Sequence, residues 1–263
     1  MLMEINKIYN ESCLETLKNM PDDFIDLVVT SPPYDDLRDY KGFAFPFEQI
    51  TKELYRVLKK GGVVVWVIGD STINGSESGT SFKQALFFKE TGFNIHDTMI
   101  WDKGTFTATG SLKVRYASVF EYMFVFSKDL PKTFNPIKDK KNKTFGMVFS
   151  TSRVRQKDGT TKPRNNPTKP TSEFGQRNNI WQISTAKPFG NHPAVFPEQL
   201  AIDHIQSWSN EGDLIYDPFM GSGTSALASI KLNRNWIGSE ISEDYVQVAN
   251  NRLEPLVKQT KLF

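Results

Sequence analysis

The sequence has a single cysteine and no long apolar run. One thiol, Cys13, cannot form an internal disulfide or a multi-cysteine metal site. The longest apolar stretch, Val63–Ile68, is far too short to cross a bilayer. The N-terminal residues do not combine a basic region with a following apolar stretch, so no secretory signal is expected. These absences favour a reducing, cytoplasmic setting.

Histidine is also scarce. The three histidines lack the spacing that is typical of metal ligands, so no metal is expected; they are His96, His192 and His204. By contrast, 263 residues with 38% hydrophobic and 13% aromatic content suffice for a sizeable core. This length fits one large α/β domain with an insertion, or two small domains.

The net charge of +2 is unevenly distributed. Residues 128–177 contain 13 lysines and arginines but four acidic residues, so their formal charge is +9 and that of the remainder is −7. A basic segment within an acidic body indicates a surface that faces a polyanion. The alternative is a solvated loop.

Hydrophobic patterning predicts alternating strands and helices, which favours a parallel sheet covered on both faces. The expected strands are Phe24–Val29, Val63–Ile68, Phe93–Trp101, Phe120–Phe126, Ile180–Ile183, Asp213–Tyr216 and Trp236–Ser239. The expected helices are Pro46–Lys60, Phe82–Glu90, Pro197–Trp208, Thr224–Lys231 and Ser242–Leu253. Gly61 and Gly62 are expected to stop the first helix, and Ser71–Ser81 to form a mobile loop. From Ser127 to Asn179 no period is sustained, so this stretch is an inserted module or a partly disordered segment.

A glycine-rich turn follows the strand expected at Asp213–Tyr216. Gly221-Ser222-Gly223 with Ala226 fits the G-x-G-x-x-A form, in which glycines let the backbone approach a nucleotide-type ligand. Glu240 ends the next expected strand, where an acid can bind both ribose hydroxyls. An NAD enzyme would share these features. However, only 42 residues follow Gly221, so the other strands must come from the N-terminal part, as in a permuted doubly wound fold.

Two segments, Thr30-Ser31-Pro32-Pro33-Tyr34 and Asp217-Pro218-Phe219-Met220-Gly221-Ser222-Gly223-Thr224, together resemble the amino-methylating DNA methyltransferases of the permuted beta arrangement. In that family the catalytic loop comes first and the S-adenosylmethionine (SAM) loop comes last. The resemblance covers nearly the whole chain and implies a SAM-dependent methyltransferase fold, α/β with a permuted, mostly parallel sheet and an inserted target-recognition region. It also implies a prokaryotic or phage source and a double-stranded DNA substrate. A homodimer and a cognate restriction endonuclease remain open.

The resemblance assigns a cofactor site. Asp217 would face the methionine amine of SAM, Glu240 would hold the ribose, and Phe196 would line the methionine end. The remaining expected cofactor residues are Phe219, Gly221, Ser222, Gly223 and Thr224. Relatives often carry Gly-Asp-Cys-Leu near the N-terminus, where the Asp reads the adenine. Here Ser12 stands in that place, so Ser12, Glu11 or a backbone group would take over this contact.

The resemblance also assigns the catalytic loop, Ser31, Pro32, Pro33 and Tyr34. The amino group of a nucleobase is a poor nucleophile because its lone pair is delocalised into the ring. The Ser31 side chain and the Pro32 carbonyl can accept its two hydrogens and so aim the lone pair at the methyl group, while the prolines fix both acceptors. Tyr34 offers a stacking face for a base that has been flipped out of the duplex.

Relatives with Ser-Pro-Pro-Tyr mostly methylate cytosine N4, whereas Asp-Pro-Pro-Tyr is typical of adenine N6 enzymes. N4-methylcytosine is therefore the expected product, and N6-methyladenine is the alternative. Enzymes that methylate protein glutamine carry Asn-Pro-Pro-Tyr in the unpermuted order, which argues against them. A rival from another class is a non-catalytic nucleic-acid-binding protein, which the two intact motifs disfavour.

Three regions are expected along the chain. Residues 1–127 form the catalytic half, residues 128–179 the target-recognition insert, and residues 180–263 the SAM-binding half. The residues expected to contact DNA are Lys138, Lys140, Lys141, Lys143, Arg153, Arg155, Arg164 and Asn165. If the insert is only a linker, recognition falls to the loops at Ser71–Ser81 and Lys103–Arg115.

Overall fold

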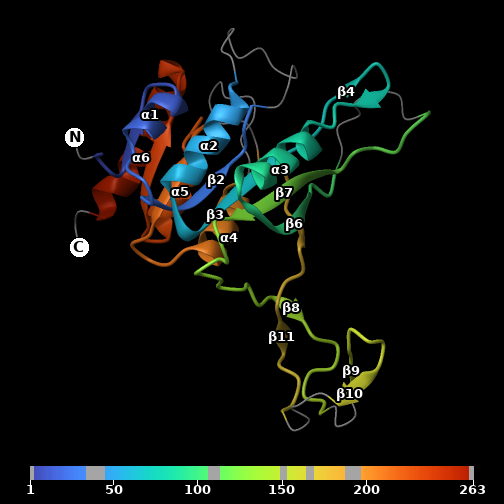
Figure 1. Cartoon of the computed structure of the whole chain (residues 1–263). Helices are drawn as coiled ribbons and strands as arrows, with labels where there is room; N and C mark the ends of the chain where they lie inside the picture. The colour runs from blue at the N-terminus through green and yellow to red at the C-terminus, as the bar shows by residue number, and fades with distance from the viewer. Residues whose placement is uncertain are drawn as a thin grey trace. The chain divides into compact units, whose positions relative to one another are not determined.

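The computed structural model describes residues 3–33, 45–105, 113–148, 153–163, 169–186 and 197–260. The chain divides into two compact units (Figure 1). The larger unit combines Met1–Asn135 with Asn179–Phe263, and the smaller unit is Pro136–Asn178. The smaller unit thus falls inside the insert expected at residues 128–179, and residues 128–135 belong with the larger one.

The larger unit is built on one mixed sheet, which in the described residues has eight strands. In spatial order they are β1 (Lys7–Tyr9), β14 (Asn235–Ser239), β13 (Leu214–Asp217), β2 (Ile25–Thr30), β3 (Leu58–Ile68), β7 (Phe120–Ser127), β6 (Asn94–Asp102) and β12 (Ile180–Gln182). Strand β7 runs antiparallel to both of its neighbours, and the other neighbouring strands pair parallel. The expectation of a mostly parallel sheet is confirmed.

Helices pack against the sheet in two series. They are α1 (Cys13–Asn19), α2 (Phe47–Val57), α3 (Thr80–Thr91), α4 (Glu198–Trp208), α5 (Thr224–Lys231) and α6 (Glu243–Thr260). Helix α2 contacts α1 and α3, while α5 contacts α4 and α6. The chain leaves β2 and β13 in opposite directions across the sheet, so right-handed crossovers put α2 and α5 on opposite faces. None of the helices in the described ranges is long and apolar enough to cross a membrane.

The core explains the long aliphatic strands. Every residue of β2 is buried, as is nearly all of β3, because helices cover both faces of the sheet. The Phe88 ring from α3 stacks on Phe126 of β7 with ring centroids 4.1 Å apart. Trp66 of β3 packs against the same Phe88 and donates its indole N–H to Gln84.

Two sequence-based expectations were wrong near the first half of the sheet. Helix α2 ends at Val57, and Gly61-Gly62 lies inside β3. Gly61 has a left-handed φ of +76° and exchanges backbone hydrogen bonds with Lys128 and Lys132 after β7, so tertiary pairing overrode the local stop signal. The Ser71–Ser81 stretch contains a short hairpin, β4 (Thr72–Ile73) and β5 (Ser76–Glu77), and the start of α3.

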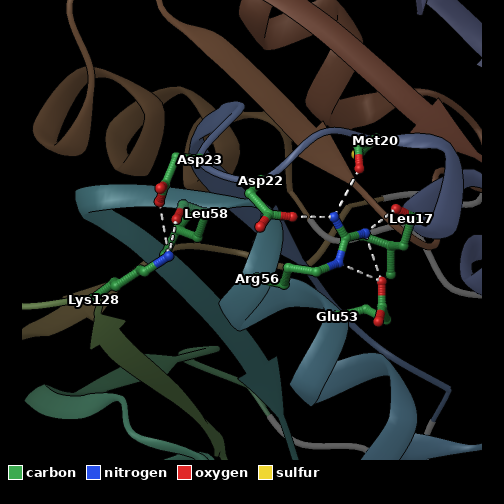
Figure 2. Close-up of polar contacts among 8 residues, drawn as sticks. All are labelled: Leu17, Met20, Asp22, Asp23, Glu53, Arg56, Leu58 and Lys128. Atoms are coloured by element: carbon green, nitrogen blue, oxygen red, sulfur yellow. Dashed lines mark hydrogen bonds and ion pairs between the residues drawn. The ribbon is translucent and has the colours of Figure 1, made fainter. Parts of the chain in front are cut away.

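A cluster of polar contacts ties α1 and α2 together at the edge of the sheet where β2 begins (Figure 2). The Arg56 guanidinium donates to the carbonyls of Leu17 and Met20, at 2.7 and 2.8 Å, where α1 ends. It also pairs with Asp22 and Glu53, both at 2.7 Å. A cation that satisfies the last carbonyls of a helix stabilises its C-terminus, so this cluster is structural.

The same edge holds a buried carboxylate, Asp26 of β2. Its Oδ2 accepts hydrogen bonds from Lys59 at 2.7 Å and from the Leu214 backbone N–H at 3.0 Å, and Oδ1 accepts from Lys132. Burial alone would raise the pKa of Asp26, but these donors outweigh it and the pKa is lowered. Asp26 therefore joins β2 to β13 and to the segment that follows β7.

The smaller unit contains two antiparallel strand pairs among its described residues. They are β8 (Lys140–Lys141) with β11 (Phe174–Gly175), and β9 (Arg153–Arg155) with β10 (Thr161–Pro163). An ion pair between Arg177 and Asp139, at 2.5 Å, holds the beginning and end of the unit together. Of the two alternatives left open for this stretch, its described residues favour an inserted module.

Candidate cofactor and catalytic site

The two motifs follow neighbouring strands of the sheet. Strand β2 ends at Thr30, just before Ser31, and β13 ends at Asp217. The strands are parallel, with Ile215 opposite Leu27, so both motifs emerge at the same edge. Because the chain leaves β2 and β13 in opposite directions, this is the point at which strand order reverses, where open α/β sheets bind their ligands.

A buried carboxylate joins the motifs directly. Asp217 Oδ1 accepts a hydrogen bond of 2.6 Å from the Thr30 hydroxyl and one of 3.0 Å from the Phe219 backbone N–H. Asp217 Oδ2 accepts from the Ser225 hydroxyl of α5, also at 2.6 Å. All three side chains that make these bonds are buried. The catalytic loop is therefore anchored, one residue before Ser31, to the first residue of the glycine-rich motif.

The environment of Asp217 favours a cationic neighbour. Burial raises the pKa of Asp217, and the hydrogen bonds from Ser225, Thr30 and Phe219 offset only part of that rise. Glu240 lies close enough for the charge of Asp217 to raise the pKa of Glu240 as well. A positive group placed between two such carboxylates would relieve both costs.

The glycine-rich turn adopts the conformations that its glycines permit. Gly221 and Gly223 have left-handed φ values of +51° and +82°, and Gly223 is the residue before helix α5. The Met220 backbone N–H donates to Ser239 of β14 at 2.9 Å. Gly238, which the sequence did not single out, leaves room for Met220, because a Cβ there would lie 2.9 Å from the Met220 Cγ. The loop thus depends on a third glycine.

Glu240 stands directly beside this turn. Its Oε2 accepts from the Gly221 N–H at 2.8 Å, and its Oε1 accepts from the Ser242 N–H at 2.9 Å. Partial burial is the main cause that raises the pKa of Glu240. Each oxygen keeps a second lone pair for a further donor. The sequence expected Glu240 near the glycine loop, and the structure brings them together.

Arg252 of α6 supports the glycine loop and was not found from the sequence. Its guanidinium donates to the Ser222 carbonyl at 3.2 Å and to the Thr224 hydroxyl at 3.0 Å. Glu198 of α4 lies 3.9 Å from Arg252, and burial lowers the pKa of the guanidinium. Position in the final helix gives no sequence signal for this contact, which depends on how α5 and α6 pack.

Ser12 lies in the turn between β1 and α1, beside β14. The neighbouring Asn10 donates to the Glu240 carbonyl at 2.9 Å, which brings the turn to the same sheet edge as the glycine loop. Ser12 is the N-cap of α1 and its hydroxyl accepts from the Leu14 N–H at 3.2 Å. The Glu11 carboxylate accepts from the Thr16 hydroxyl at 2.8 Å. Both candidates for the adenine contact therefore already stabilise the start of the helix.

The catalytic loop is described as far as Pro33. Pro32 is buried, whereas Ser31 and Pro33 are partly exposed. Four predicted site residues lie outside the described residues; they are Tyr34, Arg164, Asn165 and Phe196.

Further charged side chains gather at this edge of the sheet. Asp70, after β3, accepts from the Ser78 hydroxyl and the Ser81 backbone N–H, both at 3.0 Å, at the start of α3. Lys103, after β6, pairs at 2.6 Å with Glu121 of β7, and both side chains are largely shielded from solvent. Sequence reasoning passed over these residues because isolated charges in loops carry no pattern.

The remaining predicted DNA contacts belong to the smaller unit. All six are exposed; they are Lys138, Lys140, Lys141, Lys143, Arg153 and Arg155. Arg153 and Arg155 are two residues apart on β9, so they project from one face of the β9–β10 hairpin. In the ranges that the structure describes, no three His, Cys, Asp or Glu side chains gather as a metal site would require.

Comparisons with known proteins agree with this geometry. A family model described as DNA methylase, of the N6/N4 type, matches residues 25–251. The orphan methyltransferase M.BamHII of Bacillus amyloliquefaciens is 53% identical, over 90% of this chain and 91% of that protein. The DNA adenine methyltransferase YhdJ of Escherichia coli (strain K12) is 26% identical, over 95% of this chain and 83% of that protein.

The fold has solved counterparts. The PvuII DNA methyltransferase, titled cytosine-N4-specific, superposes with a TM-score of 0.68 at 21% identity, over 97% of this chain and 91% of that one. Identity at this level shows the fold alone. Methylases that match at similar scores have been solved with SAM bound.

Proposed function

Because this chain belongs to the N6/N4 family of SAM-dependent DNA methylases, we propose that it transfers the methyl group of SAM to N4 of cytosine in duplex DNA. The observation that carries this proposal is the Thr30–Asp217 hydrogen bond. It fixes the Ser-Pro-Pro loop against the glycine-rich motif, so an amine held by Ser31 lies beside a cofactor held by that motif.

For the cofactor, the proposal assigns the two carboxylates different tasks. Asp217 and its hydrogen-bonded shell face the methionine ammonium, and Glu240 accepts from the ribose hydroxyls with its remaining lone pairs. Phe196 and Phe219 line the methionine end and Ser12 contacts the adenine side. Calorimetric titration with S-adenosylhomocysteine should give saturable binding that Asp217→Ala weakens. Tight NAD binding without any response to S-adenosylhomocysteine would overturn this assignment.

For the chemistry, the chain needs only to orient the amine. Ser31 Oγ and the Pro32 carbonyl accept the two amino hydrogens, so the nitrogen lone pair points at the methyl group. The C–N bond forms as the S–C bond breaks, S-adenosylhomocysteine leaves, and the nitrogen sheds one proton. Tyr34 stacks on the base. Tyr34→Ala should leave S-adenosylhomocysteine affinity unchanged and slow methyl transfer by about ten- to a hundredfold, the worth of one stacking contact.

The choice of cytosine rests on Ser31, where adenine enzymes usually carry Asp. Adenine N6 is the second candidate, because curated relatives include an adenine methyltransferase. Chromatography of nucleosides from DNA treated with labelled SAM separates the two products. Label in N6-methyladenine alone would reject the cytosine assignment and leave the SAM chemistry standing.

For target recognition, we assign residues 128–179 to DNA binding, with residues 1–127 as the catalytic half and 180–263 as the SAM half. The compact smaller unit carries the exposed lysines and the paired arginines of β9. Lysines that contact phosphates should set affinity and its salt dependence, whereas Arg153, Arg155, Arg164 and Asn165 should reach base edges.

These two roles are separable by experiment. Changing Lys138, Lys140, Lys141 and Lys143 together to Gln should weaken binding to all sequences about equally. Arg153→Ala should relax the choice of base at one position. The measurement is methylation across single-base site variants at fixed salt, and equal behaviour of the two variants would reject the division.

A further inference from the structure

One aromatic side chain stands fully in solvent on a segment that is not loose. Tyr116 is 99% exposed, the largest fraction among the large hydrophobic side chains of the described residues, and Val114 is 82% exposed. Between them, the Arg115 guanidinium donates to the Thr72 hydroxyl at 2.8 Å and to the Gly75 carbonyl at 2.7 Å. We call Lys113–Tyr116 the anchored arm. Its anchor is the turn of the β4–β5 hairpin.

The anchored arm leads into the strand beside the catalytic edge. Four residues after Tyr116, β7 begins, and its Tyr122 pairs with Ile68 where β3 ends. Strand β3 in turn pairs with β2, with Trp66 opposite Thr30. Figure 1 shows the β4 hairpin and the chain leading into β7 projecting from the same end of the sheet. Tyr116 therefore stands at the edge from which Ser31 emerges.

An aromatic surface continues from the arm along this edge. Phe120 lies 5.4 Å from Tyr122, and Phe82 of α3 lies 5.5 Å from the same ring, measured between centroids. Phe120 and Phe82 are themselves exposed. Within the arm, the order Lys113-Val114-Arg115-Tyr116 alternates basic and apolar side chains. Aromatic faces interleaved with cations are what nucleic acid bases and phosphates bind.

We propose that the anchored arm is a wedge that enters the DNA helix, with Tyr116 occupying the space that the flipped-out target base leaves in the stack. The inference rests on the proposed function, since a buried amine is reached only when its base leaves the duplex. A side chain inserted between base steps offsets the lost stacking. Lys113 meets the adjacent phosphates, and Arg115 holds the hairpin that braces the arm.

The wedge has a signature that a general DNA contact lacks. Its benefit applies when the target base must be pulled from a pair, and it fades when the base is already unpaired. Tyr116→Ala should therefore lower kcat/KM on a matched duplex by about ten- to a hundredfold. On a duplex with a mismatch opposite the target base, the rate should return close to that of the unchanged protein. Tyr116→Phe, which keeps the ring, should behave like the unchanged protein on both.

A matched control is available on the opposite edge of the sheet. Leu130 is 79% exposed and follows the other end of β7, so Leu130→Ala should change neither rate. Calorimetry with S-adenosylhomocysteine should give the same affinity for all these variants. Arg115→Ala, which releases the anchor, should produce a smaller loss with the same dependence on pairing.

Each result discriminates. Equal losses on matched and mismatched duplexes would make Tyr116 an ordinary DNA contact, and no loss on either would make it a spectator or part of a protein interface; both outcomes overturn the wedge. If the unchanged protein methylates DNA, the proposed function stands whatever Tyr116 does. If it methylates neither duplex nor single-stranded DNA, the proposed function fails and the wedge fails with it.

Discussion

Replacing Thr30 by Val tests the link between the two motifs. Valine keeps the shape of threonine but removes the hydroxyl that donates to Asp217 at 2.6 Å. A hydrogen bond to a charged group contributes about 1.5–3 kcal/mol, so we expect the free energy of unfolding at neutral pH to fall by about 2 kcal/mol. Ser225 and the Phe219 N–H remain, so the fold should persist.

The loss should depend on pH in a defined direction. The folded-state pKa of Asp217 is raised above the ordinary value of 3.8, so protonation of this group favours the folded state. That contribution is fully present below the ordinary pKa and is lost as the pH rises through the raised pKa. Removing the Thr30 donor raises the pKa further. The difference between Thr30→Val and the unchanged protein should therefore be small in acid and largest at neutral pH.

The cofactor site should respond together with stability. Affinity for S-adenosylhomocysteine should fall by about tenfold, equivalent to 1.4 kcal/mol, because a less ionised Asp217 holds the ammonium less well. Glu240, the other carboxylate that faces this site, is unchanged in the variant and keeps its two backbone donors. Thr30→Ser restores the hydroxyl and should recover most of the affinity.

Urea unfolding across a pH series and calorimetry provide the measurements. Thr51→Val is the matched control, since Thr51 is also buried but donates to the neutral Phe47 carbonyl at 2.9 Å. It should cost about 1 kcal/mol at every pH and leave cofactor affinity unchanged. If Thr30→Val behaved as this control does, the coupling between the motifs through Asp217 would be rejected.

Three further changes test the supports of the site and of the sheet. Gly238→Ala should displace Met220 and lower S-adenosylhomocysteine affinity while costing about 1–3 kcal/mol of stability, and an unchanged affinity would count against the packing account. Arg252→Gln should weaken cofactor binding severalfold by loosening the glycine loop, with methyl transfer recovering at saturating SAM; a loss of rate that saturation does not relieve would contradict this. Asp26→Asn should destabilise the fold by about 2 kcal/mol at neutral pH, a figure discounted because both partner lysines are partly exposed. Since the pKa of Asp26 is lowered, its contribution is present above the ordinary value of 3.8 and vanishes as the pH falls below it, so a difference that persisted in strong acid would refute the assignment.

Local chemistry explains what could be read from the sequence alone. Helix α5 begins and ends where it was predicted, at Thr224 and Lys231, because a glycine turn precedes it and the apolar pattern stops. The position of Gly221, with only 42 residues after it, was enough to predict a permuted sheet. Gly, Pro and alternating aliphatic residues act over a few positions, so they can be recognised without knowing the neighbours in space.

The tertiary structure decided what depends on distant partners. Gly61-Gly62 signals the end of a helix locally, yet it lies in a strand because Lys128 and Lys132 pair with it. Thr30 and Asp217, which are 187 residues apart, meet only because β2 and β13 are neighbours. Hydroxyls and single charges have no periodic pattern, so their partners become visible only when packing brings the strands and helices together.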